Sequence, residues 1–169
     1  MYSVTVTGDA AEMQISDTLP EQAHESLCWA LRYWNEHRGR RAMPSRTDVD
    51  PMDFPRLLPA TYLLERLPDD DFMVRVAGTR FREVYGREVT GQKISELVPQ
   101  DTGSDFHDDV RLCIQHLHPV FREGRATWRP SGVATRFQRV MLPLGTDESH
   151  ADYLLGFAIF FDEHGRPEV

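Results

Sequence analysis

The most regular pattern of apolar and polar positions in the chain is helical and extends over residues 18–39. Apolar side chains recur there at the spacing that places them on one helix face: Ala23, Leu27, Ala30, Leu31 and Trp34. Thr18 and Glu21 have the spacing of a capping box, and Gly39 follows the last periodic residue. The pattern predicts a helix over residues 18–39. The alternating segment before it, residues 1–17, is either flexible or strand-forming, and we favour a mobile terminus.

Alternation with a period of two predicts five strands farther along the chain. The predicted strands are residues 60–67, 72–77, 120–128, 133–144 and 153–162. The links Pro68-Asp69-Asp70-Asp71 and Pro130-Ser131-Gly132 are short, and short links favour antiparallel neighbours. We therefore expect one antiparallel sheet.

Helical segments separate the second and third of these strands. Short helices are predicted over residues 80–85 and 93–98, and a longer one runs from Ser104 to about His118. The last strand is apolar on both faces, because Tyr153, Leu155, Phe157, Ile159 and Phe161 alternate with Leu154, Gly156, Ala158 and Phe160. Such a strand needs cover on both faces. We therefore predict an α+β fold with a five-stranded antiparallel sheet, helices on one face and the N-terminal helix on the other.

Proline-rich residues 40–59 connect the N-terminal helix to the sheet. This segment also contains Met52, Phe54, Leu57 and Leu58, which give it apolar surface to bury, so we expect an ordered connector. The sequence Asp50-Pro51-Met52-Asp53 within it predicts a single helical turn. Residues 60–162 then form the core domain, and residues 163–169 a C-terminal tail.

The charge balance excludes several classes of partner. The 169 residues carry 19 Lys and Arg against 27 Asp and Glu, a formal net charge of −8. Nucleic acid and anionic membranes both attract a positive field, so we expect neither as a partner. We find no signal peptide and no apolar run long enough to span a bilayer, and we interpret Cys28 and Cys113 as free thiols. A cytoplasmic location follows as an expectation.

Several short motifs occur in an order and spacing that resemble one bacterial branch of the PAS domain family, over about residues 27–162. They are Leu31-x-Tyr33-Trp34, Arg38-Gly39, Pro44-x-Arg46-x-Asp48-x-Asp50-Pro51, Leu57-Leu58-Pro59, Arg75-Val76-Ala77-Gly78-Thr79 and Gly86-Arg87-Glu88-x-Thr90-Gly91. The resemblance implies a sensory and protein-interaction module that binds small molecules between sheet and helices, often dimerises and is usually not an enzyme. Because only residues 163–169 follow the last strand, we expect a stand-alone protein that signals through a partner protein in trans.

A hydrophobic small molecule between the longer helix and the sheet is the ligand that this resemblance and the apolar pattern favour. The residues predicted to line its pocket are Tyr85, Phe106, Val110, Ile114, Trp128, Phe137 and Phe157. A filled core without a ligand is the alternative, and it would leave a pure protein-interaction adaptor.

The N-terminal helix carries more aromatic surface than one stripe requires. Trp29 and Tyr33 lie beside the stripe that contains Leu27 and Trp34. We therefore predict a homodimer in which Leu27, Trp29, Tyr33 and Trp34 form the contact.

Catalytic and cofactor motifs are weak throughout the sequence. Cys113 lies on an apolar stripe and lacks the neighbours of a flavin-adduct cysteine, so we interpret it as a buried apolar residue. His107, His116 and His118 are candidate haem ligands, but last-turn histidines suit a helix dipole, and we expect neither haem nor a metal site. Asp108-Asp109 fits acids in a first helical turn. We expect no enzyme; an unrecognised small-molecule enzyme remains a remote alternative.

The one basic cluster comprises Arg38, Arg40, Arg41 and Arg46. Such a cluster can bind a phosphate or an acidic partner. We favour the simpler interpretation, in which these arginines cover the connector and pair with nearby acids such as Asp48.

Overall fold

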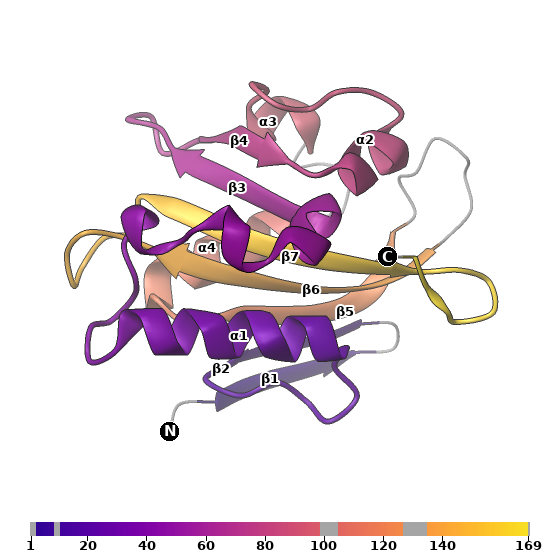
Figure 1. Ribbon diagram of the computed structural model, residues 1–169, viewed down its shortest axis with the longest axis horizontal. Coiled ribbons are helices and arrows are strands. Elements are labelled where there is room, and N and C mark those ends of the chain that lie inside the picture. The colour runs from indigo at the N-terminus through magenta and orange to yellow at the C-terminus, as the bar shows by residue number, and fades with distance from the viewer. Residues whose placement is uncertain (1–2, 9–10, 99–104, 127–134, 169) are drawn as a thin grey trace.

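The structure, a computed structural model, describes residues 3–8, 11–98, 105–126 and 135–168 and contains one antiparallel sheet between two helical layers (Figure 1). The strands are β1 (Ser3–Gly8), β2 (Ala11–Ser16), β3 (Thr61–Arg66), β4 (Phe72–Ala77), β5 (Val120–Ala126), β6 (Thr135–Leu144), β7 (Tyr153–Phe161) and β8 (Pro167–Glu168). Their order in the sheet is β1-β2-β5-β6-β7-β3-β4, and β8 pairs with β7. The five predicted strands are therefore present as β3 to β7, within one continuous sheet.

The predicted strand count was too low, because strands also form at both ends of the chain. The hairpin β1–β2 joins the sheet through β2 and β5, where Ile15 pairs with Val120. The exposed edge of β5 offers a row of backbone hydrogen-bonding groups, and β2 uses them. The favoured interpretation of residues 1–17 as a mobile terminus is thus wrong for β1 and β2, and the tail 163–169 contains β8.

The N-terminal helix α1 spans Glu25–Arg38 and begins later than residue 18. Its N-cap is His24, whose ring Nδ1 accepts a hydrogen bond from the Ser26 backbone N–H. The His24 backbone N–H in turn donates to Oε1 of the β6 residue Gln138, at 2.7 Å. This tertiary bond fixes the helix start, which local capping signals alone placed at Thr18. At the other end, the helix stops at Gly39, whose φ is +58°.

The connector contains three short 3₁₀ helices. They are η1 (Arg46–Asp48), η2 (Pro51–Asp53) and η3 (Pro55–Ala60). The predicted turn at η2 forms with the Asp50 side chain accepting from the Met52 N–H. On the opposite face of the sheet lie α2 (Thr79–Tyr85), α3 (Ile94–Leu97) and α4 (Phe106–His116). Figure 1 shows α1 in front of the sheet and α4 behind it.

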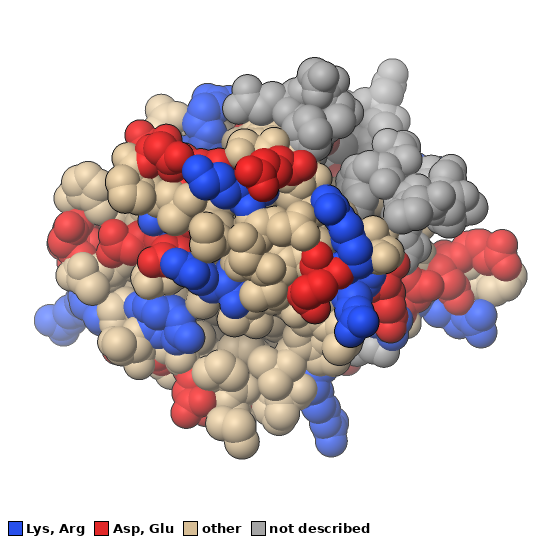
Figure 2. Space-filling model, turned by 90° about the horizontal axis from the view of Figure 1, so that it is seen from above, with Lys and Arg blue, Asp and Glu red and all other residues tan. Residues whose placement is uncertain are grey.

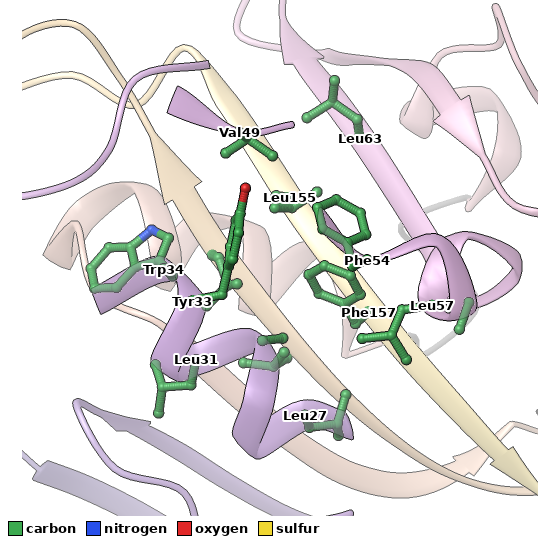
Figure 3. Close-up of a cluster of buried hydrophobic side chains, with 14 of the residues drawn as sticks. Leu27, Leu31, Tyr33, Trp34, Val49, Phe54, Leu57, Leu63, Leu155 and Phe157 are labelled. Carbon is green, nitrogen blue, oxygen red and sulfur yellow. The ribbon is translucent and has the colours of Figure 1, made fainter. Parts of the chain in front are cut away.

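Two apolar clusters fill the space on the two faces of the sheet. One joins α1 and the connector to β6 and β7, and includes Leu31, Trp34, Phe54, Leu155 and Phe157 (Figure 3). The other cluster packs the helices α2, α3 and α4 against the opposite face of the same strands. Successive side chains of a strand point to opposite faces. The prediction that β7 is covered on both faces is therefore confirmed.

The surface mixes charges of both signs. Figure 2, which views the molecule from above, shows acidic and basic side chains interspersed over the face that it presents. Ion pairs such as Arg66–Asp70 and Lys93–Asp69 lie on the surface and contribute little to stability. Across the described residues, no helix combines the length and the apolar character needed to cross a membrane.

Candidate functional site

A buried cluster of charged side chains lies between α4 and the sheet. Arg122 on β5 and Arg139 on β6 are directly opposite each other in the antiparallel register. Asp109 extends from α4 toward both, and only 1% of its surface is exposed. Two like charges opposite each other on neighbouring strands are destabilising on their own. The carboxylate of Asp109 therefore offsets the repulsion between the two arginines by pairing with both.

The geometry of the cluster is that of strong, charge-assisted bonds. Arg122 Nε lies 2.9 and 2.8 Å from the two carboxylate oxygens of Asp109, and its Nη2 lies 2.6 Å from Oδ1. Arg139 Nη2 donates to Asp109 Oδ2. At the rim, Asp105 Oδ2 is 3.2 Å from Arg122 Nη1. Two arginines and two aspartates thus balance each other.

Aromatic rings surround the guanidinium of Arg139. Its Cζ lies 4.8 Å from the ring centroid of Phe106 and 5.3 Å from that of Phe137. Burial by itself lowers the pKa of Arg139, but Asp109 and the nearby tyrosines raise it, and the net shift is upward. Burial also raises the pKa of Tyr85 to about 12. Arg139 is therefore charged and Tyr85 neutral at neutral pH.

Tyr62 on β3 belongs to the apolar cluster on this face. Its side chain is buried, and its hydroxyl has no hydrogen-bond partner among the described residues. Burial raises the pKa of this hydroxyl, which is therefore neutral at physiological pH. Buried tyrosine hydroxyls usually find a partner. Among the described residues, the Tyr62 hydroxyl therefore has an unused capacity for hydrogen bonding.

Comparison with known proteins identifies the family. A family model described as a PAS domain matches residues 22–159, which is most of the chain. This chain belongs to the PAS domain family. A search of curated proteins found no significant match.

The solved structures that align with this chain are distant in sequence. The crystal structure of a Rhodobacter sphaeroides LOV protein aligns with a TM-score of 0.50 and 19% identity, over 69% of this chain and 71% of that chain. A fungal LOV domain photoreceptor aligns with a TM-score of 0.47 and 17% identity, over 68% of this chain and 93% of that chain. At 19% identity, the likeness to the Rhodobacter sphaeroides protein shows the fold alone. The PAS fold indicates a sensory domain, and PAS domains are generally not enzymes.

Most of the residues predicted to line one ligand pocket belong to the apolar cluster on the α4 face, namely Tyr85, Phe106, Val110, Ile114 and Phe137. Phe106 and Phe137 flank Arg139, and Tyr85 packs against the same apolar cluster. Val110 and Ile114 line a groove of about 890 Å³ between α4 and the β3–β4 turn. Trp128 lies outside the described residues.

The prediction that Phe157 lines the pocket between α4 and the sheet was wrong. It packs on the α1 face against Phe54, with ring centroids 5.4 Å apart. The alternation of β7 was assigned correctly, but the face turned toward α4 carries Leu154, Ala158 and Phe160 instead. Phe157 therefore cannot share a pocket with Phe106.

Gly156 accommodates Tyr62 on the α4 face of the sheet. A Cβ atom at this position would lie only 1.8 Å from Tyr62 Cζ. We expect Gly156→Ala to displace the ring and to lower the free energy of unfolding by about 1–3 kcal/mol, measured by urea denaturation. Adding Tyr62→Ala should remove the clash, so that the two changes together cost less than their sum. Strict additivity would contradict this packing.

The remaining cofactor candidates are engaged within the fold. The Cys113 thiol is fully buried and lies 3.7 Å from the Met141 carbonyl oxygen, and burial raises its pKa well above the ordinary value. Reactive thiols have the opposite properties, so Cys113 does not fit a flavin-adduct cysteine. The His107 ring bonds to the Val98 carbonyl, and His118 Nδ1 lies 3.7 Å from Asp17 Oδ1. Of the residues that the structure describes, no three His, Cys, Asp or Glu side chains converge as metal ligands.

The predicted dimer residues are mostly inside the chain. Leu27, Tyr33 and Trp34 are 0%, 6% and 1% exposed. The Tyr33 hydroxyl donates to Asp53 Oδ2 at 2.8 Å, and burial raises its pKa to about 12. These three side chains are already covered by the sheet and the connector, which corrects their assignment to a dimer contact. Trp29 is only partly buried.

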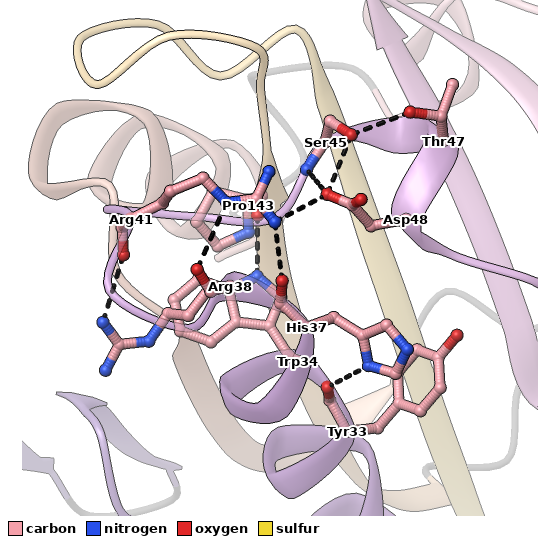
Figure 4. A network of polar contacts seen from close by, with 9 residues as sticks. All are labelled: Tyr33, Trp34, His37, Arg38, Arg41, Ser45, Thr47, Asp48 and Pro143. Atoms are coloured by element: carbon pink, nitrogen blue, oxygen red, sulfur yellow. Dashed lines mark hydrogen bonds and ion pairs between the residues drawn. The ribbon is translucent and has the colours of Figure 1, made fainter.

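Arg41, which follows α1, binds to the C-terminal end of the helix (Figure 4). Arg41 Nη2 donates to the His37 carbonyl at 2.7 Å and to Asp48 Oδ2 at 2.9 Å. Arg38 Nη2 lies 3.9 Å from Asp17. Helix C-termini leave carbonyl groups without partners, and cations satisfy them. The interpretation that these arginines cover the connector and pair with acids is confirmed for Arg41 and Asp48.

The sequence analysis missed Tyr62, Arg122 and Arg139. Asp109 was interpreted as a dipole-stabilising acid, and its burial shows a different role. The cluster could have been anticipated from the pairing of β5 with β6, because this register places Arg122 and Arg139 opposite each other on the face that α4 covers. Buried arginines on one face require a carboxylate from the layer above.

Proposed function

We propose that this PAS domain is a sensory module that binds a small molecule on the α4 face of its sheet, with the Tyr62 hydroxyl as its polar anchor. The observation that carries the proposal is the Tyr62 hydroxyl, which is buried without a hydrogen-bond partner in the described chain. A ligand oxygen or nitrogen that hydrogen-bonds to this hydroxyl would remove the free-energy cost of burying it without a partner. The module would act in the cytoplasm and pass its signal to a protein partner in trans.

The surroundings of Tyr62 favour a largely apolar ligand. Its ring lies 5.3 Å from Phe81 and 6.2 Å from Phe106, measured between centroids. The nearby charge of Arg139 is balanced by Asp109, so the site exerts little net attraction on an anion. An apolar body with a single hydrogen-bonding group fits this environment.

Native mass spectrometry of the purified protein tests the proposal. We expect a stoichiometric extra mass on the wild-type chain. Tyr62→Phe should retain the fold and weaken binding about fivefold, because it removes one neutral hydrogen bond worth about 1 kcal/mol. Tyr153→Phe is the control, since Tyr153 packs against the α1 cluster on the opposite face of the sheet and bonds at most weakly, at 3.5 Å, to Glu65. Bare chain in every preparation would overturn the proposal.

A filled core is the second candidate, and one observation favours it. Cys113, Met141 and Leu154, all on the α4 face, are 0% exposed. Under this alternative the domain is a protein-interaction adaptor without a ligand. Bare chain that still captures one defined partner protein would support it.

A further inference from the structure

The two edge strands of the sheet differ in how far the chain covers them. At one end lies β4, and the loop after α2 covers part of its outer edge. The Val74 backbone N–H donates to the Gln92 carbonyl oxygen at 3.0 Å, and the Gly91 N–H donates to the Val74 carbonyl oxygen at 2.7 Å. At the other end lies β1, which pairs only with β2 among the strands that the structure describes (Figure 1). The outer edge of β1 therefore offers backbone hydrogen-bonding groups to a further strand.

The sequence of β1 lacks the features that keep exposed edges apart. Native edge strands commonly carry charged residues, prolines or bulges, which oppose pairing with another chain. Ser3-Val4-Thr5-Val6-Thr7-Gly8 contains neither a charge nor a proline, in a chain with 19 basic and 27 acidic residues. Its pairing with β2 runs from Ser3 to Gly8 without a register shift. β1 is therefore a regular strand whose sequence does not oppose the addition of another.

The residues of β1 also match their own reverse order. About Thr5 as the centre, Val4 corresponds to Val6 and Ser3 to Thr7. In an antiparallel pair of two β1 strands centred on this residue, valine therefore lies opposite valine and a hydroxyl residue opposite a hydroxyl residue. Serine and threonine form hydrogen bonds across strands, and no pair brings like charges together. This symmetry favours a second copy of the chain over an unrelated segment.

The register of the sheet places the two valines beside apolar residues. Val4 pairs with Ile15 and Val6 with Met13, and both of these β2 residues are buried in the apolar cluster on the α4 face. Positions two apart on a strand share a face of the sheet. A second β1 strand in the centred register would add its own two valine positions to this row.

We infer that two copies of the chain associate by pairing their β1 strands antiparallel about a twofold axis at Thr5, so that one sheet runs through both copies. Each copy uses its β1 edge in the contact, and the loop after α2 covers part of the β4 edge, so association stops at two chains. The contact does not involve α1, and it does not rest on the proposed ligand.

Charged substitutions in β1 test the contact by light scattering and sedimentation over a range of concentrations. The variant V4K/V6K places like charges opposite each other in the two copies and should weaken association at least tenfold. V4E/V6E should do the same, and an equal mixture of the two variants should associate as the wild type does, because opposite charges then meet. Val76→Lys introduces a charge on β4, where the side chain is already 42% exposed, and should leave association unchanged. Circular dichroism checks that each variant keeps its fold.

Disulfide formation tests the position of the axis, in a Cys28→Ser background that removes the exposed native thiol. Residue 5 lies opposite its own copy, and the Cα atoms of opposite residues in an antiparallel pair are about 4.5–5.5 Å apart, within reach of a disulfide. Thr5→Cys should therefore give a covalent dimer on mild oxidation. Thr7→Cys is the control, because the two copies of residue 7 are offset by about 13 Å along the strands and should stay reduced.

Three results would contradict the inference. The first is a wild-type chain that stays monomeric at high micromolar concentration, including one whose β1 edge captures an extended peptide of another protein instead. The second is a dimer that V4K/V6K leaves intact, or a mixture with V4E/V6E that fails to associate. The third is a Thr7→Cys variant that cross-links as readily as Thr5→Cys.

Discussion

Asp109→Ala should lower the free energy of unfolding by about 3–5 kcal/mol, because it leaves two buried arginines without their counter-ion. Arg122 and Arg139 lie opposite each other on neighbouring strands, and each donates to the Asp109 carboxylate. Without it, two like charges remain in the same buried environment. Urea denaturation followed by circular dichroism measures the loss.

Asp108→Ala is the matched control for this experiment. Asp108 is the adjacent residue of α4, but it is exposed and pairs with Arg111 on the surface. We expect it to change stability by less than about 0.5 kcal/mol. Replacing Asp109, Arg122 and Arg139 together with apolar residues of similar volume should recover much of the stability lost by Asp109→Ala. Equal effects of the Asp108 and Asp109 variants would refute the assigned role of Asp109.

Trp34→Ala should destabilise the protein by about 3–5 kcal/mol, since it opens a cavity between α1 and the sheet. Trp34 is 1% exposed, and its indole N–H donates to the buried Pro143 carbonyl at 2.7 Å. The substitution also leaves this carbonyl without its partner. Because the side chain is internal, the expected result is loss of folding stability and not dissociation of a folded dimer.

Thermal and urea unfolding of Trp34→Ala and Trp34→Phe separate packing from hydrogen bonding. Trp34→Phe retains most of the apolar ring and loses the N–H, so we expect a smaller cost, about 1–3 kcal/mol. A variant Trp34→Ala that unfolds at the wild-type urea concentration would mean that α1 does not pack as described.

The periodicity of the chain predicted the fold because its main elements are strongly amphipathic. Strands β3 to β7 and the helices α1, α2 and α4 all appear near their predicted positions. The errors lie where a distant segment decides the outcome. The start of α1 depends on Gln138, and β2 forms because the edge of β5 is available. Neither dependence is visible within a local window of sequence.

The candidate site was only partly predictable for a related reason. Phe106 and Phe137 were identified because aromatic residues near a helix–sheet boundary suggest a pocket wall. The placement of Phe157 failed because alternation gives two faces without saying which of them meets α4. Asp109 was misinterpreted because an acid in the first turn of a helix already has a local explanation.

Neighbouring residues of strand β6 form hydrogen bonds to helical segments on opposite faces of the sheet. Gln138 accepts the N–H of His24 before α1, and Pro143 accepts the indole N–H of Trp34 toward its end. Arg139, the residue after Gln138, bonds to Asp109 of α4 on the opposite face. Because β6 is bonded to both layers, we expect any displacement of β6 by α4 to be transmitted to α1 through these bonds.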